Sequence, residues 1–121
     1  MKKVLIIEDD GFLQNLEATK IIKSGYEVIS AGTGEDAMKK IIEPGIDIII
    51  LDLLLPNFDG FEILKKIKET DTTKNIPVIV FSNLSENADI EKAVSLGATK
   101  FMVKSNFSLE ELVDHIKQLV N

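Results

Sequence analysis

The chain has 121 residues and a formal net charge of −6, and its pI is near 4.8. This length suits one domain with one core and leaves no room for a second. The acidic balance argues against direct binding to nucleic acid, and the absence of cysteine excludes disulfides and thiolate metal sites. No apolar run is long enough to span a membrane. We therefore expect a protein of the reducing cytoplasm whose partners are other proteins, a cation or both.

Short apolar runs that are typical of β-strands alternate with stretches of helical spacing. The runs begin at Val4, Val28, Ile46, Val78 and Phe101. Residues 59–69 place apolar side chains on one helical face, and residues 86–97 end at Gly97, which suits a left-handed C-cap. The last helix is expected to begin with a capping box at Ser108. Strand and helix thus alternate five times.

This alternation predicts an α/β fold with a five-stranded parallel sheet covered by helices on both faces. Ligands of such sheets bind at the carboxyl ends of the strands. Polar residues follow the first, third, fourth and fifth strands, and the second strand contributes none that can ionise. They are Glu8, Asp9, Asp10, Asp52, Ser82 and Lys104.

Asp52 interrupts an apolar run, where an ionised carboxylate costs several kcal/mol unless another group pairs with it. Carboxylates that converge on one rim also repel each other, by roughly 4 kcal/mol per pair at ~4 Å and an effective dielectric of ~20. Lys104 supplies only one compensating charge. The remaining charge favours a hard divalent cation, Mg²⁺ with Mn²⁺ as an alternative.

Together these groups form the set that phosphoryl transfer needs. Asp52 is the candidate nucleophile, at the solvent-facing end of a buried strand. The cation and the Lys104 ammonium would neutralise charge on the transferring oxygens, and the Ser82 hydroxyl would hold one of them.

In this order the residues resemble the receiver domains of two-component and phosphorelay response regulators, and the single-domain chemotaxis regulators in particular. The resemblance runs through VLIIEDD, LDLLLPNFDG, VIVFS and LGATKFMVKS, and it makes residues 1–121 one receiver domain. It implies a flavodoxin-like (βα)₅ three-layer sandwich with strand order 2-1-3-4-5. It also implies that Asp52 is the phosphoacceptor, and that Asp9, Asp10, Asp52 and the backbone carbonyl of Leu54 hold the metal.

The resemblance further implies that Lys104 and Ser82 contact the phosphoryl group, with Asn83 beside them, and that Ser82 and Phe101 are switch residues. The phosphoryl group would come from a phosphohistidine on a sensor kinase or histidine phosphotransferase. The surface formed by the fourth helix, fifth strand and fifth helix would then repack and control a downstream protein. Such a chain acts on itself rather than as a turnover enzyme, and works as a monomer or as a phosphorylation-dependent dimer.

Several positions depart from the family pattern or tune it. Ser105 follows Lys104 where the family has a proline in a cis peptide, and because a cis bond before another residue costs ~2.5–4 kcal/mol, we predict a trans bond. Asn83 replaces a small residue and either narrows the entrance or donates a hydrogen bond. Leu54 and Leu84 occupy the two positions that tune dephosphorylation. Apolar side chains cannot orient an attacking water, so we predict a long-lived phosphoryl group.

Two other classes of function compete with a phosphorylated receiver. A Mg²⁺-dependent phosphatase would place a second acid two residues after its nucleophile, where this chain has Leu54, and it would need a substrate-selecting cap. A degenerate receiver that binds partners without phosphorylation usually loses one of the acids or the lysine, and this chain keeps them all. The receiver itself could be a stand-alone regulator, a phosphorelay intermediate or a piece of a longer protein.

Overall fold

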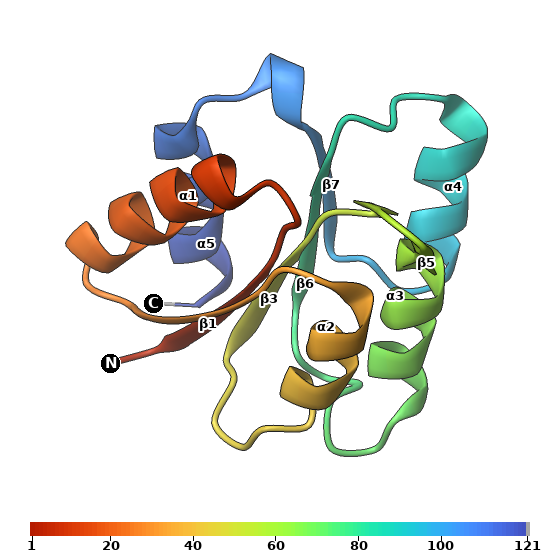
Figure 1. Ribbon diagram of the computed structural model, residues 1–121, viewed down its shortest axis with the longest axis horizontal. Helices are drawn as coiled ribbons and strands as arrows, with labels where there is room; N and C mark the ends of the chain where they lie inside the picture. The colour runs from red at the N-terminus through yellow and green to blue at the C-terminus, as the bar shows by residue number, and fades with distance from the viewer. Residues whose placement is uncertain (121) are drawn as a thin grey trace.

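The computed structural model describes residues 1–120, and a five-stranded parallel sheet forms its centre (Figure 1). Its strands are β1 (Lys3–Ile7), β2 (Glu27–Ala31), β3 (Ile48–Leu51), β6 (Val78–Ser82) and β7 (Lys100–Val103). All neighbouring pairs in the order β2-β1-β3-β6-β7 are parallel. Counted within this sheet alone, the order is 2-1-3-4-5. The predicted flavodoxin-like sheet is confirmed, and each strand begins within two residues of its predicted start.

Five α-helices cover the two faces of the sheet. They are α1 (Gly11–Lys23), α2 (Gly34–Lys40), α3 (Gly60–Glu69), α4 (Asn87–Ser95) and α5 (Leu109–Leu119), and a 3₁₀ helix, η1 (Lys104–Asn106), follows β7. Helices α1 and α5 lie on one face, and α2, α3 and α4 lie on the other (Figure 1). The structure therefore has three layers.

Two hydrophobic clusters hold these layers together, one on each face of the sheet. Successive residues of β1 point to opposite faces, so Leu5 packs in the cluster with α2, α3 and α4, whereas Ile6 packs in the cluster with α1 and α5. Strands β1, β3 and β6 are buried along almost their whole length. Burial on both faces explains why their sequences are unbroken apolar runs rather than alternating ones.

Two predicted helix signals are confirmed, one at the end of α4 and one at the start of α5. Ser108 and Glu111 form the capping box of α5, and Gly97 ends α4 with φ +107°. The Lys104–Ser105 peptide bond is trans, as the sequence predicts. No helix among residues 1–120 combines the length and the apolar character needed to cross a membrane.

A short hairpin after β3 was not among the predicted elements. Strands β4 (Leu54–Leu55) and β5 (Phe58–Asp59) pair antiparallel, and Asn57 between them has φ +57°. Strands of two residues are too short to show an alternating pattern, so the sequence indicates only a turn here. The hairpin matters for the site because it begins two residues after Asp52.

Candidate functional site

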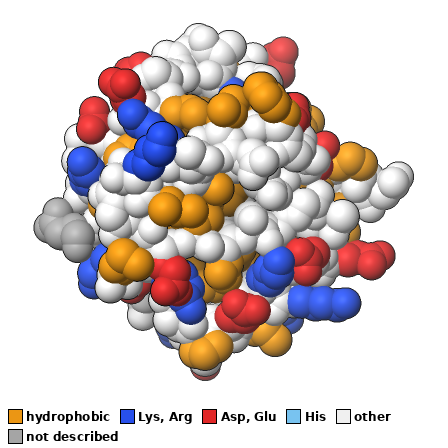
Figure 2. All heavy atoms as spheres, turned by 60° about the vertical axis from the view of Figure 1, so that its left-hand side comes forward, with side chains coloured by type: hydrophobic (Ala, Val, Ile, Leu, Met, Phe, Trp, Pro, Cys, Tyr) orange, Lys and Arg blue, Asp and Glu red, His pale blue; other side chains and the backbone are white. Residues whose placement is uncertain are grey.

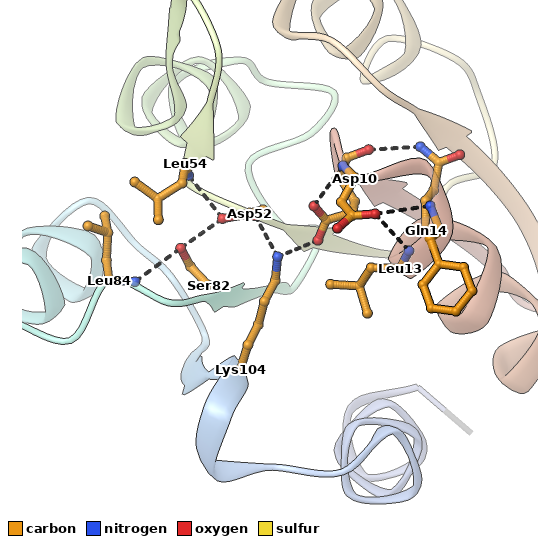
Figure 3. Close-up of polar contacts among 10 residues, drawn as sticks. Asp10, Leu13, Gln14, Asp52, Leu54, Ser82, Leu84 and Lys104 are labelled. Carbon is orange, nitrogen blue, oxygen red and sulfur yellow. Dashed lines mark hydrogen bonds and ion pairs between the residues drawn. The ribbon is translucent and has the colours of Figure 1, made fainter.

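The strand register brings the predicted polar residues to one edge of the sheet. Ile7, the last residue of β1, lies level with Leu51, the last residue of β3. The next residues, Glu8 and Asp52, therefore meet at the carboxyl edge. Ser82 ends β6 level with Val103 of β7, and Lys104 follows directly. Figure 3 shows the side chains of Asp52, Ser82 and Lys104 converging from separate elements.

Asp52 is buried, with 4% of its surface exposed, and both of its carboxylate oxygens accept hydrogen bonds (Figure 3). Oδ1 accepts from the Ser82 hydroxyl at 2.8 Å and from the Leu54 backbone N–H at 2.9 Å. Oδ2 accepts from the Lys104 ammonium at 2.6 Å. A buried carboxylate is tolerated when charged partners and hydrogen bonds satisfy it. The apolar run thus carries a carboxylate because three donors are placed to receive it.

Lys104 links Asp52 to a second buried carboxylate, Glu8, to which its ammonium also donates. Glu8 has 2% of its surface exposed. Burial raises the pKa of Glu8, and the hydrogen bond from Lys104 opposes this only in part. Burial alone would lower the pKa of Lys104, but its hydrogen bonds to Asp52 and Glu8 raise it above the usual value. The lysine is therefore fully charged at neutral pH and balances one of the two carboxylates.

Glu8, Asp9 and Asp52 form an acidic cluster. One carboxylate oxygen from each lies within 4.8 Å of the others, and Asp9 is exposed while the other two are buried. Three converging carboxylates with a single lysine carry excess negative charge. Oxygen donors grouped in this way suit a hard cation such as Mg²⁺, which keeps several water ligands. The donor set therefore fits the predicted metal, and the exposed Asp9 marks the side of the cluster that faces solvent.

Asp10 lies outside this cluster, whereas the sequence predicts Asp9 and Asp10 as the metal-binding pair. Its Oδ1 caps α1 by accepting from the backbone N–H groups of Phe12 at 3.0 Å and Leu13 at 3.1 Å. Glu8 takes its place beside Asp9. Three consecutive acids follow β1, and the sequence alone does not show which of their side chains turn toward Asp52. A helix N-terminus attracts one of them because it offers free N–H groups and a positive dipole end.

Hydrogen bonds connect three of the remaining predicted residues to Asp52: Ser82 and Leu54 directly, and Leu84 through Ser82. Ser82 is fully buried, and its Oγ also accepts from the Leu84 backbone N–H at 3.4 Å. Asn83 is exposed next to it, and Leu54 exposes 49% of its surface. Phe101 on β7 is half-buried and packs against the core cluster on the α2, α3 and α4 face. The structure thus places Ser82, Leu54 and Leu84 close to Asp52. Phe101 lies farther away, two residues before the end of β7.

The surface beside this edge is partly apolar. Phe12 and Leu16 on α1 expose 77% and 44% of their surfaces. Figure 2, which brings the α1 side of the molecule forward, shows apolar patches next to lysine side chains. Because Phe12 is the second residue of α1, this apolar surface begins next to the acidic cluster.

Glu17 is a buried residue that the sequence analysis missed. It shares the buried face of α1 with Ile21, exposes 1% of its surface, and its Oε2 has no hydrogen-bond partner among residues 1–120. Burial, followed by the negative charge of Glu8, raises the pKa of Glu17 to about 8. Its spacing of four residues from Ile21, an apolar position, was the available signal, because that spacing puts both on one helical face.

Replacing Glu17 with methionine is expected to increase the free energy of unfolding by about 1–3 kcal/mol at pH 7, because it removes a buried polar group that lacks a partner. In the native protein this carboxyl titrates near 8, and in the unfolded chain near 4.5. The folded state therefore holds an extra proton between these values and loses stability as the pH rises through them. The advantage of the variant should grow from pH 6 to pH 9 in urea unfolding followed by circular dichroism. A variant less stable than the native protein at pH 9 would contradict this account.

The parallel sheet in this order, with acids, a hydroxyl and a lysine at one edge, is the arrangement that the sequence led us to expect of a receiver domain. The model of the response regulator receiver domain matches residues 4–117, and the chain belongs to that family. Among curated relatives, the alkaline phosphatase synthesis transcriptional regulatory protein PhoP of Bacillus subtilis is 32% identical over 98% of this chain and 48% of its own length. AfsQ1 of Streptomyces coelicolor, a transcriptional regulatory protein, is 33% identical over 86% of this chain and 45% of its own length. The chain thus spans about half the length of these relatives.

Solved structures show the same fold. The chemotaxis protein CheY4 of Vibrio cholerae has a TM-score of 0.90 and 27% identity, over 99% of both chains. The response regulator TrrA of Thermotoga maritima, solved in complex with Mg²⁺ and BeF, has a TM-score of 0.86 and 29% identity, over 99% of this chain and all of that one. The expected family is therefore confirmed. It is a family of signalling domains of two-component systems and not of turnover enzymes.

Proposed function

We propose that this chain accepts a phosphoryl group on Asp52 from a phosphohistidine of a sensor kinase or histidine phosphotransferase, in a reaction that requires Mg²⁺. The observation that carries the proposal is the environment of Asp52, whose carboxylate is held by Ser82, Lys104 and the Leu54 N–H. The acidic cluster beside it supports the metal requirement, as does the solved complex of the related TrrA with Mg²⁺ and BeF.

In the transfer an Asp52 oxygen attacks phosphorus, the new O–P bond forms, and the bond from phosphorus to the donor's imidazole nitrogen breaks. Lys104 and Ser82 now donate to Asp52, so they lie within reach of phosphoryl oxygens attached to it. Glu8, Asp9 and Asp52 would hold the metal, together with the backbone carbonyl of Leu54. When bound, the metal neutralises negative charge on the phosphoryl oxygens. Asp10 instead keeps α1 capped.

The output is a change of protein surface. A phosphoryl group on Asp52 would draw the Ser82 hydroxyl toward it, and Phe101 would turn inward into the space that this movement opens. The α4, β7 and α5 surface then repacks for a downstream protein or a second copy, since the phosphoryl group favours one of two existing states. Leu54 and Leu84 flank the site with apolar side chains that do not orient water, so the phosphoryl group should persist.

The test is the intact mass of the protein after incubation with Mg²⁺ and acetyl phosphate. One added phosphoryl group is expected on the native chain and none on Asp52→Asn, because an amide is a poor nucleophile. After removal of the donor, the decay of the added mass measures the phosphoryl lifetime, which should exceed seconds. Equal addition to both chains would place the phosphoryl group elsewhere, and no addition to either would favour a receiver that acts without phosphorylation.

A second measurement distinguishes the two acids that follow Glu8. Mg²⁺ at about 100 times its Kd is expected to stabilise the native protein by about 2.7 kcal/mol and raise its Tm. Asp9→Asn should lose most of this shift because Asp9 belongs to the acidic cluster. Asp10→Asn should keep it, since asparagine also caps helices well. Thermal unfolding with and without Mg²⁺ measures all three proteins. Loss of the shift in both variants would support the pairing of Asp9 with Asp10 expected from the sequence, and loss in Asp10→Asn alone would contradict the place of Asp9 in the site.

A further inference from the structure

Glu17 is a buried acid of α1, the helix that begins two residues after Asp9. It is in the middle of α1, on the face packed toward the sheet, and 1% of its surface is exposed. Its Oε2 has no hydrogen-bond partner in the described part of the chain. The charges that act on it are those of Glu8, Lys104, Asp52 and Asp10, of which three are negative. A carboxyl in this position responds to the net charge at the carboxyl edge of the sheet.

Other elements that pack against α1 contribute little charge at this point. Helix α1 contacts β1, β2 and α5. Glu27 at the start of β2 pairs with Lys3 at the opposite end of the sheet, and Glu110 of α5 pairs with Lys20 on the outer side of α1. Within residues 1–120, the largest effects on the pKa of Glu17 come from burial and from Glu8, Lys104, Asp52 and Asp10, and not from the ionisable groups of α5. These groups are Glu110, Glu111, Asp114, His115 and Lys117.

We propose that Glu17 couples proton release to cation binding: its carboxyl holds a proton while Glu8, Asp9 and Asp52 are without a cation, and loses it to solvent when a divalent cation binds there. The inference rests on the cation site of the proposed function. Burial favours the proton on Glu17, and the negative charges of Glu8, Asp52 and Asp10 add to this effect. A cation of charge +2 offsets that negative charge and therefore favours loss of the proton. Because such coupling is reciprocal, an ionised Glu17 also strengthens cation binding.

The consequence is that cation affinity depends on pH near neutrality. Burial holds the pKa of Glu17 at about 8 in the cation-free protein, so most molecules carry the proton at pH 7. Lys104 keeps its charge across this range because its pKa is raised. The native protein and a Glu17→Gln variant share every other ionisable group, so the difference between the two isolates Glu17.

The experiment is calorimetric titration with MgCl₂ at pH 6.5, 7.5 and 8.5, in buffers that differ in ionisation enthalpy. The native protein should release at least about half a proton per Mg²⁺ more than Glu17→Gln at pH 7.5. Its affinity should also rise about tenfold more than that of Glu17→Gln between pH 6.5 and 8.5. Glu43→Gln is the matched control, because Glu43 is exposed in the connection before β3, at the other edge of the sheet. It should behave as the native protein does.

The outcomes separate the two proposals. If the native protein does not bind Mg²⁺ at any pH, the cation site and the metal requirement of the proposed function fail. If it binds but releases the same number of protons as Glu17→Gln, only the role of Glu17 is overturned. A test without a variant is the carboxyl ¹³C resonance of Glu17 at pH 7. It should have the position of a protonated acid without Mg²⁺ and of a carboxylate with saturating Mg²⁺, and an unchanged resonance would overturn the inference.

Discussion

Replacing Lys104 with methionine is expected to lower the free energy of unfolding of the metal-free protein by about 3–5 kcal/mol at pH 7. The lysine is the shared partner of Glu8 and Asp52, whose side chains expose only 2% and 5% of their surfaces. Without it two buried carboxylates face each other with no positive charge between them. Methionine keeps most of the length and apolar character of the lysine stem, so the change reports mainly on charge.

The pH and metal dependence of this loss identify its cause. Burial raises the pKa of Glu8, so as the pH falls a proton neutralises this carboxylate and the difference between the native protein and Lys104→Met should shrink. Saturating Mg²⁺ should stabilise the variant more than the native protein, since the cation would replace the missing charge. Urea unfolding followed by circular dichroism at pH 5 and pH 7, with and without Mg²⁺, measures both effects.

Lys74→Met provides the control for Lys104→Met. Lys74 pairs with Asp71 at 3.3 Å, but their side chains expose 51% and 94% of their surfaces. An exposed pair contributes less than about 1 kcal/mol because water and salt screen it. If Lys104→Met cost no more than Lys74→Met, the buried carboxylates would not depend on the lysine for their charge balance.

The fold could be predicted because its signals are long and agree with one another. Apolar runs such as VLII and VIVF are long enough to mark strands buried on both faces, and the capping box at Ser108 marks a helix start by itself. The hairpin of β4 and β5 has strands of two residues and depends on Asn57 at positive φ. Neither feature forms a pattern in the sequence, so the hairpin was not predicted.

For the site, the sequence showed which residues take part, but it did not show which way every side chain points. Asp52, Ser82 and Lys104 each stand alone at a strand end, and the parallel order suffices to bring them together. Three consecutive acids follow β1, and the strand register together with the α1 cap decides which of them turn inward. Glu17 illustrates the opposite case. A glutamate within a helix is normally exposed, and only tertiary packing shows that this one is not.

Alanine at Gly60 is expected to destabilise the protein by about 3 kcal/mol, at the upper end of the usual cost of overpacking. A Cβ atom at this position would lie 2.4 Å from the Leu53 Cα and 2.5 Å from the Leu53 carbonyl oxygen. Both are backbone atoms, so no side-chain rotation relieves the clash. Leu53 would have to shift, and it lies between Asp52 and Leu54, whose N–H donates to the Asp52 carboxylate. Phosphorylation by acetyl phosphate should therefore slow as well.

Gly11→Ala separates this clash from the general effect of removing a glycine. Gly11 is the first residue of α1, as Gly60 is of α3, and a Cβ at Gly11 meets nothing within 4 Å. Because alanine favours helix by about 1 kcal/mol over glycine, Gly11→Ala should be neutral or stabilising. In Gly60→Ala, both the stability in urea unfolding and the rate of mass increase with acetyl phosphate should fall. In Gly11→Ala, both should stay unchanged or improve. Equal stability of the two variants would mean that the β3–α3 connection accommodates a side chain, and that its close approach to Gly60 does not hold Asp52 in place.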